Sequence, residues 1–271
     1  MSRTRSSASF SFSAMSVEGN LLAPAILKEI ANSSAPNQTE SDYHVPRGVT
    51  LRDELARYFR IGQATFRHLH ASSEPSLKAT TRFVSDLLVD VLGFSAVSLA
   101  GVLTHDGHQF PVSLQALGGR VPIVVVPPVD GLEAPSTHLR PDGRRRSAAI
   151  ALQDWLNVSD GALWGLCTNG NAIRLLRDNR SLTRPAFIEF DLQQIFDNED
   201  FASFTMLWLL LHSTRFGQAE TPISDCPLER WREAGAKTGE VALRQPRHQL
   251  GLQAQFVLRS TGSRGSPADP R

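Results

Sequence analysis

Two histidines and an aspartate lie close together at one turn of the chain: His105, Asp106 and His108. Imidazole and carboxylate groups at this spacing can bind zinc, which takes four protein ligands in a structural site and three in a catalytic one. No other cysteine, histidine or acid nearby in the sequence is placed to complete such a set. We therefore interpret the two histidines as surface residues of a turn and predict no metal site.

A second candidate for chemistry is Cys167 with a distant histidine such as His212, which could act as nucleophile and base. Cys167 lies in an apolar, strand-like run, where a small buried thiol is the usual occupant. The sequence also contains no Walker loop, no GxGxxG motif, no GxSxG elbow and no CxxC pair. From these patterns we predict no catalytic residue and no cofactor.

Arginine is the third residue type with a chemical use, because guanidinium groups bind phosphate. Arginines cluster in residues 140–146, before a predicted helix, and in residues 174–184, after a predicted turn. An acidic block over residues 189–200 could instead balance their charge, and the sequence leaves both interpretations open. For a DNA contact, we predict a surface at one edge of the sheet that is made by Arg144, Arg145, Arg146, Arg174 and Arg177.

The composition limits the function classes that these residues can serve. The chain has 271 residues, of which 41% are hydrophobic and 20% charged, and its formal net charge is +1. This charge balance excludes a globally basic nucleic-acid binder. The longest apolar stretch, residues 206–211, is far shorter than the roughly 20 residues of a membrane helix. Two cysteines fit a reducing compartment, so we expect a cytoplasmic protein without a membrane segment.

Hydrophobic periodicity predicts the elements that must position these residues. A spacing of three to four residues predicts helices over 51–69 and 75–92, the second of them closed by Gly93. Alternation predicts strands over 97–103, 110–117, 121–126, 163–168, 171–176 and 187–192. Further helices are predicted over 145–157, 201–216 and 225–240. This order indicates an α/β fold with a mixed central sheet flanked by helices.

Two dipeptides predict hairpin turns, Asp106-Gly107 and Asn169-Gly170. For the second we expect a type I′ turn, with positive φ at both residues. Residues 43–240 are interpreted as one domain. Residues 1–42 are expected to be disordered or loosely ordered, and residues 241–271 to be a disordered basic tail.

The order of the segments resembles a known family. A helix is followed by strands, by a helix that carries Gln153, and by a Trp-Gly-x-x-Thr-Asn-Gly hairpin over 164–170. This order resembles the nuclease-like N-terminal region of type IIG restriction-modification proteins. It looks closest to the adenine-specific DNA methyltransferase subunits of phage-defence systems such as DISARM. The resemblance covers roughly residues 43–235. Its segments are 51–60, 152–157, 163–170, 187–196 and 207–211.

The resemblance implies a degenerate PD-(D/E)xK nuclease fold. Active nucleases of this kind hold Mg²⁺ with an acid and a Glu-x-Lys on a central strand. The matching strand, 123–128, has no carboxylate and no lysine, and Asp106 alone cannot organise a magnesium site. The loop motif of an adenine methyltransferase is also missing, so we expect the chain to be a fragment. The implied function is a non-catalytic module that contacts DNA or acts as a scaffold, with other defence-system subunits as further partners.

Two other functions remain open. One is a metal-dependent DNA endonuclease with a migrated active site, in which Asp106 acts with Glu189 or Asp191. The other is a protein–protein interaction module that docks through the apolar helix predicted over 201–216. Salt-dependent DNA binding favours a DNA-contacting domain over the interaction module, and Mg²⁺-dependent cleavage identifies an endonuclease.

Overall fold

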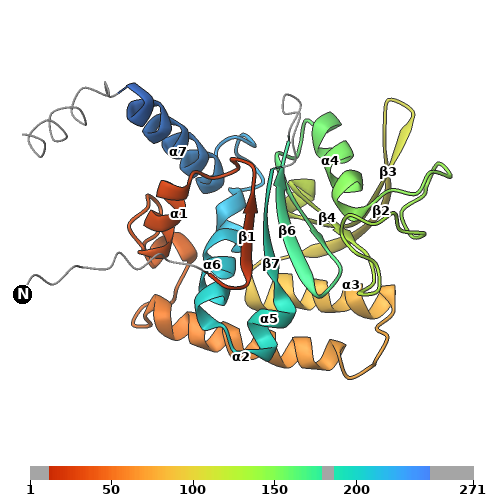
Figure 1. Cartoon of the computed structure of the whole chain (residues 1–271), viewed down its shortest axis with the longest axis horizontal. Helices are drawn as coiled ribbons and strands as arrows, with labels where there is room; N and C mark the ends of the chain where they lie inside the picture. The colour runs from red at the N-terminus through yellow and green to blue at the C-terminus, as the bar shows by residue number, and fades with distance from the viewer. Residues whose placement is uncertain (1–11, 179–185, 245–271) are drawn as a thin grey trace, which may run out of the picture.

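A computed structural model describes residues 12–178 and 186–244, with the side chains of the last helix described as far as Lys237. These residues form an α/β fold around one seven-stranded mixed sheet (Figure 1). The strands are β1 (Met15–Glu18), β2 (Val97–His105), β3 (His108–Ala116), β4 (Val121–Val125), β5 (Trp164–Thr168), β6 (Ala172–Arg177) and β7 (Phe187–Asp191). Their spatial order is β1-β7-β6-β5-β4-β3-β2, and all neighbours are antiparallel except β4 and β5, which run parallel. The predicted α/β class and mixed sheet are confirmed.

Helices cover both faces of the sheet (Figure 1). On one face, α4 (Ala148–Val158) and the long loop before it pack in a smaller apolar cluster with Val124 and Cys167. The opposite face carries the larger core, to which Ile123 and Val125 belong. Its helices are α1 (Pro24–Ala31), α2 (Leu51–Leu69), α3 (Leu77–Asp86) with the π-helical turn Leu87–Val91, α5 (Leu192–Asp197), α6 (Phe201–Leu211) and α7 (Pro227–Arg244). Successive residues of β4 thus enter different clusters, as strand alternation requires.

The first part of the described chain is more regular than the sequence predicted. β1 pairs with β7 from Met15↔Phe190 to Glu18↔Phe187, and α1 buries Ile26 and Ile30. Residues 12–42 therefore contain regular secondary structure, unlike the loosely ordered segment that the sequence predicted. The strand escaped prediction because it is only four residues long and exposes most of its side chains at the sheet edge. Residues 1–11 and 245–271, with the basic tail expected there, lie outside the described residues.

The apolar helix α6 lies inside the larger core. Eight of its eleven residues are buried, among them Met206 and Leu210. The indole N–H of Trp208 donates a 2.8 Å hydrogen bond to the carbonyl oxygen of Val91. The apolar residues of α6 are therefore covered by the rest of the described protein and do not form an exposed docking face. Within the described residues, no helix is both long enough and apolar enough to cross a membrane.

Gly93 ends the helix formed by α3 and its π-helical turn, as the sequence predicted. Its φ is +72°, a left-handed conformation that glycine adopts without steric cost. A Cβ atom at this position would lie 2.6 Å from Nε2 of His212. Glycine is therefore required here both by the backbone and by the imidazole ring.

We expect Gly93→Ala to lower the free energy of unfolding by roughly 2 kcal/mol, because alanine disfavours positive φ and its methyl group displaces the His212 ring. Gly48 is the matched control, since its φ is +85° and no atom lies within 4 Å of a Cβ there. Gly48→Ala then carries only the conformational part, about 1 kcal/mol. Urea denaturation measures both losses, and equal losses would contradict the effect assigned to His212.

Candidate nucleic-acid interface

The loop between β4 and α4, residues 127–147, carries four arginines and is called the arginine loop below. Leu132 and Leu139 anchor it, at 6% and 3% exposure, in the smaller apolar cluster. Ser136 and Arg146 form a β-bridge, in which the Ser136 N–H donates to the Arg146 carbonyl oxygen over 2.9 Å. The Arg146 N–H donates to the Leu139 carbonyl oxygen over 3.0 Å. These contacts hold the loop in a defined conformation.

The side chain of Arg146 is used inside this loop. Its Nη1 and Nη2 atoms donate to the two carboxylate oxygens of Asp142 over 2.9 and 2.7 Å, and Nε lies 3.3 Å from Oδ2 of Asp154. The hydrogen bonds from Arg146 lower the pKa of Asp142 to about 2. Because two carboxylates compensate its charge, Arg146 is a structural residue of the loop and a poor partner for phosphate.

Three other arginines of the loop have side chains that are exposed to solvent. Arg140, Arg144 and Arg145 are exposed, and no ion pair within the described chain joins their side chains to a carboxylate. The backbone around them is fixed, because the Gly143 N–H donates to the Arg140 carbonyl oxygen and the Arg144 N–H to Asp142. An ordered backbone with uncompensated guanidinium groups is suited to phosphate contact.

Arg174 of β6 connects the arginine loop to the sheet. Its Nη2 and Nε atoms contact Oε2 of Glu189 over 2.7 and 2.9 Å, and its Nη1 atom pairs with Glu133 of the loop. The guanidinium carbon lies 3.7 Å from the centre of the Phe187 ring. The side chain is only 7% exposed. Arg174 therefore positions the loop and is not itself accessible to a phosphate.

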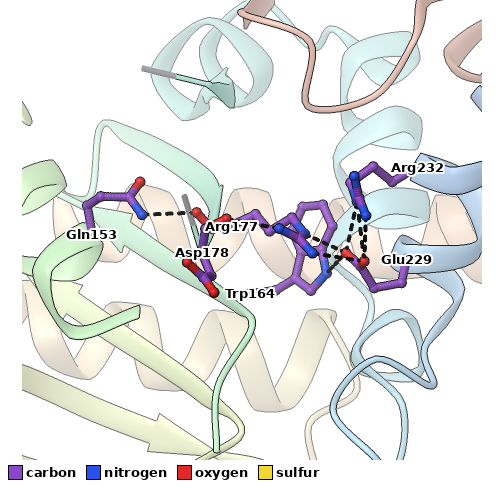
Figure 2. A network of polar contacts seen from close by, with 6 residues as sticks. All are labelled: Gln153, Trp164, Arg177, Asp178, Glu229 and Arg232. Carbon is purple, nitrogen blue, oxygen red and sulfur yellow. Dashed lines mark hydrogen bonds and ion pairs between the residues drawn. The ribbon is translucent and has the colours of Figure 1, made fainter. Parts of the chain in front are cut away.

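Arg177, at the end of β6, belongs to a separate buried network (Figure 2). Its Nε and Nη2 atoms contact the carboxylate of Glu229 in α7 over 2.7 and 3.1 Å. The same carboxylate accepts from the Trp164 indole over 3.0 Å and from Arg232 over 3.2 Å. Burial raises the pKa of Glu229, but the hydrogen bonds from Arg177 and Arg232 outweigh it and leave the pKa below its usual value.

The five predicted arginines do not form one surface. Arg174 contacts the loop on the α4 side of the sheet, whereas Arg177 contacts α7 on the other side. A separation of three residues in a strand requires this, because side chains alternate between the faces. The predicted surface thus retains only Arg144 and Arg145, to which the structure adds the neighbouring Arg140.

The hairpin between β5 and β6 holds the first residues of the arginine loop in place. The Asn169 amide nitrogen donates to the Asp130 carbonyl oxygen over 3.0 Å, and its oxygen accepts from the backbone N–H groups of Asn171 and Ala172. A Cβ on Gly170 would lie 3.0 Å from side chains of α2 and α3. The hairpin is therefore wedged between these helices and the loop.

The turn of this hairpin differs from the prediction. Only Gly170 has a positive φ, at +85°, while Asn169 does not. The Asn169 N–H donates to the Ala172 carbonyl oxygen, so Gly170 and Asn171 are the central residues. A positive φ at the first central residue alone is the pattern of a type II′ turn, not type I′. The Asp106-Gly107 hairpin has positive φ at both central residues, at +47° and +76°, as a type I′ turn requires.

The candidate catalytic pairs are not assembled. Cys167 is fully buried in the smaller cluster, and burial raises its pKa to about 12. His212 is buried beside Trp208 in the larger core, on the other side of the sheet. Asp106 lies at the turn between β2 and β3, and three strands separate β3 from β7, so Asp106 is on the order of 20 Å from Glu189 and Asp191. The described structure therefore does not bring Asp106 together with Glu189 or Asp191 at one metal site.

The turn histidines lie side by side, because His105 and His108 are directly paired at the end of the hairpin. A depression of about 310 Å³ beside them is also lined by Asn157, in the last turn of α4, and by Asp160, which follows this helix. Among the residues that the structure describes, no three histidine, cysteine, aspartate or glutamate side chains are placed to hold a metal ion. Compared with known proteins, the chain matches no family model, no curated protein and no solved structure.

Proposed function

We propose that this domain is a non-catalytic DNA-contacting module, and that its contact surface is the exposed part of the arginine loop. The observation that carries the proposal is the division of charge within the loop. Arg146 takes up the carboxylates of Asp142 and Asp154, and this leaves Arg140, Arg144 and Arg145 on a fixed backbone. Three such guanidinium groups provide sequence-independent phosphate contacts.

The nuclease-like classification is part of the same proposal. It is supported by the order of a helix, an antiparallel meander, a crossover helix with Gln153, and the hairpin that begins at Trp164. The residues of β4 and the valine that follows it do not provide ligands for a magnesium ion. Val124, Val125 and Val126 are at most 1% exposed and offer no oxygen ligand from their side chains. Within a restriction-modification or phage-defence methyltransferase, such a domain would hold DNA without cutting it.

The decisive test measures DNA affinity against salt concentration. Replacing Arg140, Arg144 and Arg145 together by alanine is expected to weaken binding to all sequences alike. Each phosphate contact contributes about −0.9 to the slope of log affinity against log salt, so the slope should become shallower by up to about three units. Fluorescence anisotropy with a labelled duplex, at salt concentrations from about 50 to about 300 mM, measures this slope.

The matched control removes the same charge from the opposite side of the sheet. Arg52, Arg60 and Arg67 are exposed on α2, and their replacement by alanine should leave the slope unchanged. A slope that changes only in the α2 variant would move the DNA surface to that helix. An unchanged slope in both variants would refute the arginine-loop proposal.

The proposal also predicts that the protein does not cleave DNA. A supercoiled plasmid incubated with the chain and Mg²⁺ or Mn²⁺ should remain intact, because β4 offers valines where nucleases of this kind hold the metal. Agarose electrophoresis measures the outcome. Cleavage that disappears in Asp106→Ala would contradict the non-catalytic assignment and favour an endonuclease.

A further inference from the structure

A second cavity lies at the carboxyl ends of β4 and β5, the parallel pair of the described sheet. Pro128 and Val129 follow β4 and Asn171 follows β5, and all three line the cavity. In open α/β sheets, ligands bind preferentially outside the carboxyl ends of parallel strands. The volume of about 490 Å³ is within the range of small-molecule sites.

The polar groups of this cavity are suited to a neutral ligand that donates hydrogen bonds. Asn171 and Gln193 contribute carboxamides, and Glu74 contributes a carboxylate. The Asn171 side-chain oxygen is buried and accepts no hydrogen bond from the described residues. Carboxamides pair with base edges through two hydrogen bonds, and a carboxylate accepts from an amino group. Glu74 at the same time disfavours an anionic ligand such as phosphate.

His70 and Ser73 also line the cavity, and its apolar wall suits the face of a flat ring. Pro75 and Pro128 line the cavity, together with Val129. Val129 is 87% exposed, the largest exposed fraction among the large apolar side chains of the described chain. A ring that enters the cavity would remove part of this apolar surface from water, which favours binding.

The cavity and the proposed phosphate contacts belong to the same segment of chain. Pro128 and Val129 begin the arginine loop, whose later residues carry Arg140, Arg144 and Arg145. We propose that the cavity receives one unpaired, amino-bearing base of DNA, adenine or cytosine, and this inference rests on the proposed DNA-contacting function. An exocyclic amino group would donate to the oxygens of Asn171 and Glu74, and the adjacent ring nitrogen would accept from a carboxamide N–H.

The experiment compares four single-stranded thymidine oligonucleotides that differ only at the central position: adenine, cytosine, thymine or an abasic site. The 271-residue chain should bind the adenine and cytosine strands about tenfold more tightly than the abasic strand, the size of one bidentate base contact. Thymine lacks the amino group and should behave like the abasic strand. Asn171→Ala and Gln193→Leu should each remove most of the preference. Gln109→Leu, on an exposed residue of β3, should retain it.

The outcomes separate this inference from the proposed function. Gln193 is exposed, so its variant tests the cavity even if the hairpin variant fails to fold. Equal affinity for all four strands, with the salt slope still dependent on the arginine loop, would overturn the base-binding cavity and leave the DNA contact standing. Binding of thymine as tightly as adenine would overturn the amino-group assignment. Absence of binding to every strand at low salt would overturn both.

Discussion

Replacing Glu229 by alanine is expected to lower the free energy of unfolding by roughly 3–5 kcal/mol, the cost of removing one partner from a buried ion pair. Glu229 is 3% exposed and accepts from Trp164, Arg177 and Arg232. Without the carboxylate, the partly buried charge of Arg177 and the buried N–H of Trp164 both lose their partner. Chemical denaturation at neutral pH measures the loss.

Arg232 provides the control within the same network. It contacts the same carboxylate over 3.2 Å, but its side chain is 35% exposed and can be hydrated when the contact is lost. Arg232→Ala should therefore cost no more than about 1 kcal/mol. Comparable losses for both variants would show that the network contributes through surface charge, in contradiction to the buried pair as the source.

The elements of the domain could be predicted because each is encoded locally. The stripe of α2 and the alternation of β3 depend on residues within a few positions of one another. Gly93 shows the same, since a glycine directly after an apolar stripe identified the helix end. β1 could not be found this way, because a four-residue strand at a sheet edge carries too little periodicity.

The partners of the arginines could not be predicted, because they are remote in sequence. Arg174 contacts Glu189 at a separation of 15 residues and Glu133 at 41, and Arg177 contacts Glu229 at 52. The predicted balance by an acidic block holds for Glu189 alone among these contacts. By contrast, strand alternation alone places the side chains of Arg174 and Arg177 on opposite faces of the sheet, because three positions separate them in β6. The predicted grouping of both arginines on one surface is incompatible with this alternation.

The contacts of the Trp-Gly-x-x-Thr-Asn-Gly segment show which part of the candidate site could not be predicted from the sequence. The sequence indicated a hairpin but not what its residues contact. Trp164 holds α7 through Glu229, and a Cβ on Gly165 would lie 2.8 Å from Leu152 of α4. Asn169 fixes the start of the arginine loop. The segment therefore joins both helical layers to the sheet and sets the position of the proposed DNA surface.

Acidification from pH 7 to 4.5 is expected to remove roughly 2.5 kcal/mol of stability through His212 alone. Burial, with smaller contributions from the charges of Arg215 and His44, lowers the pKa of His212 to about 3. The unfolded chain takes up a proton near pH 6.5, whereas the folded chain does not until about pH 3. The unfolded state therefore binds more protons throughout this window, and stability falls as the pH falls.

His212→Asn isolates this effect, because an amide does not titrate and can still contact Oγ1 of Thr214, which lies 2.9 Å from Nδ1 of the histidine. Urea denaturation of the parent and the variant at pH 7 and 4.5 gives four free energies. Other groups that titrate, Glu229 and Asp42 among them, contribute equally to both proteins. The pH-dependent loss should therefore be smaller in the variant by about 2.5 kcal/mol. An identical loss in both would mean that the imidazole is protonated in the folded protein at pH 4.5, against the effect of its burial beside Trp208 and Arg215.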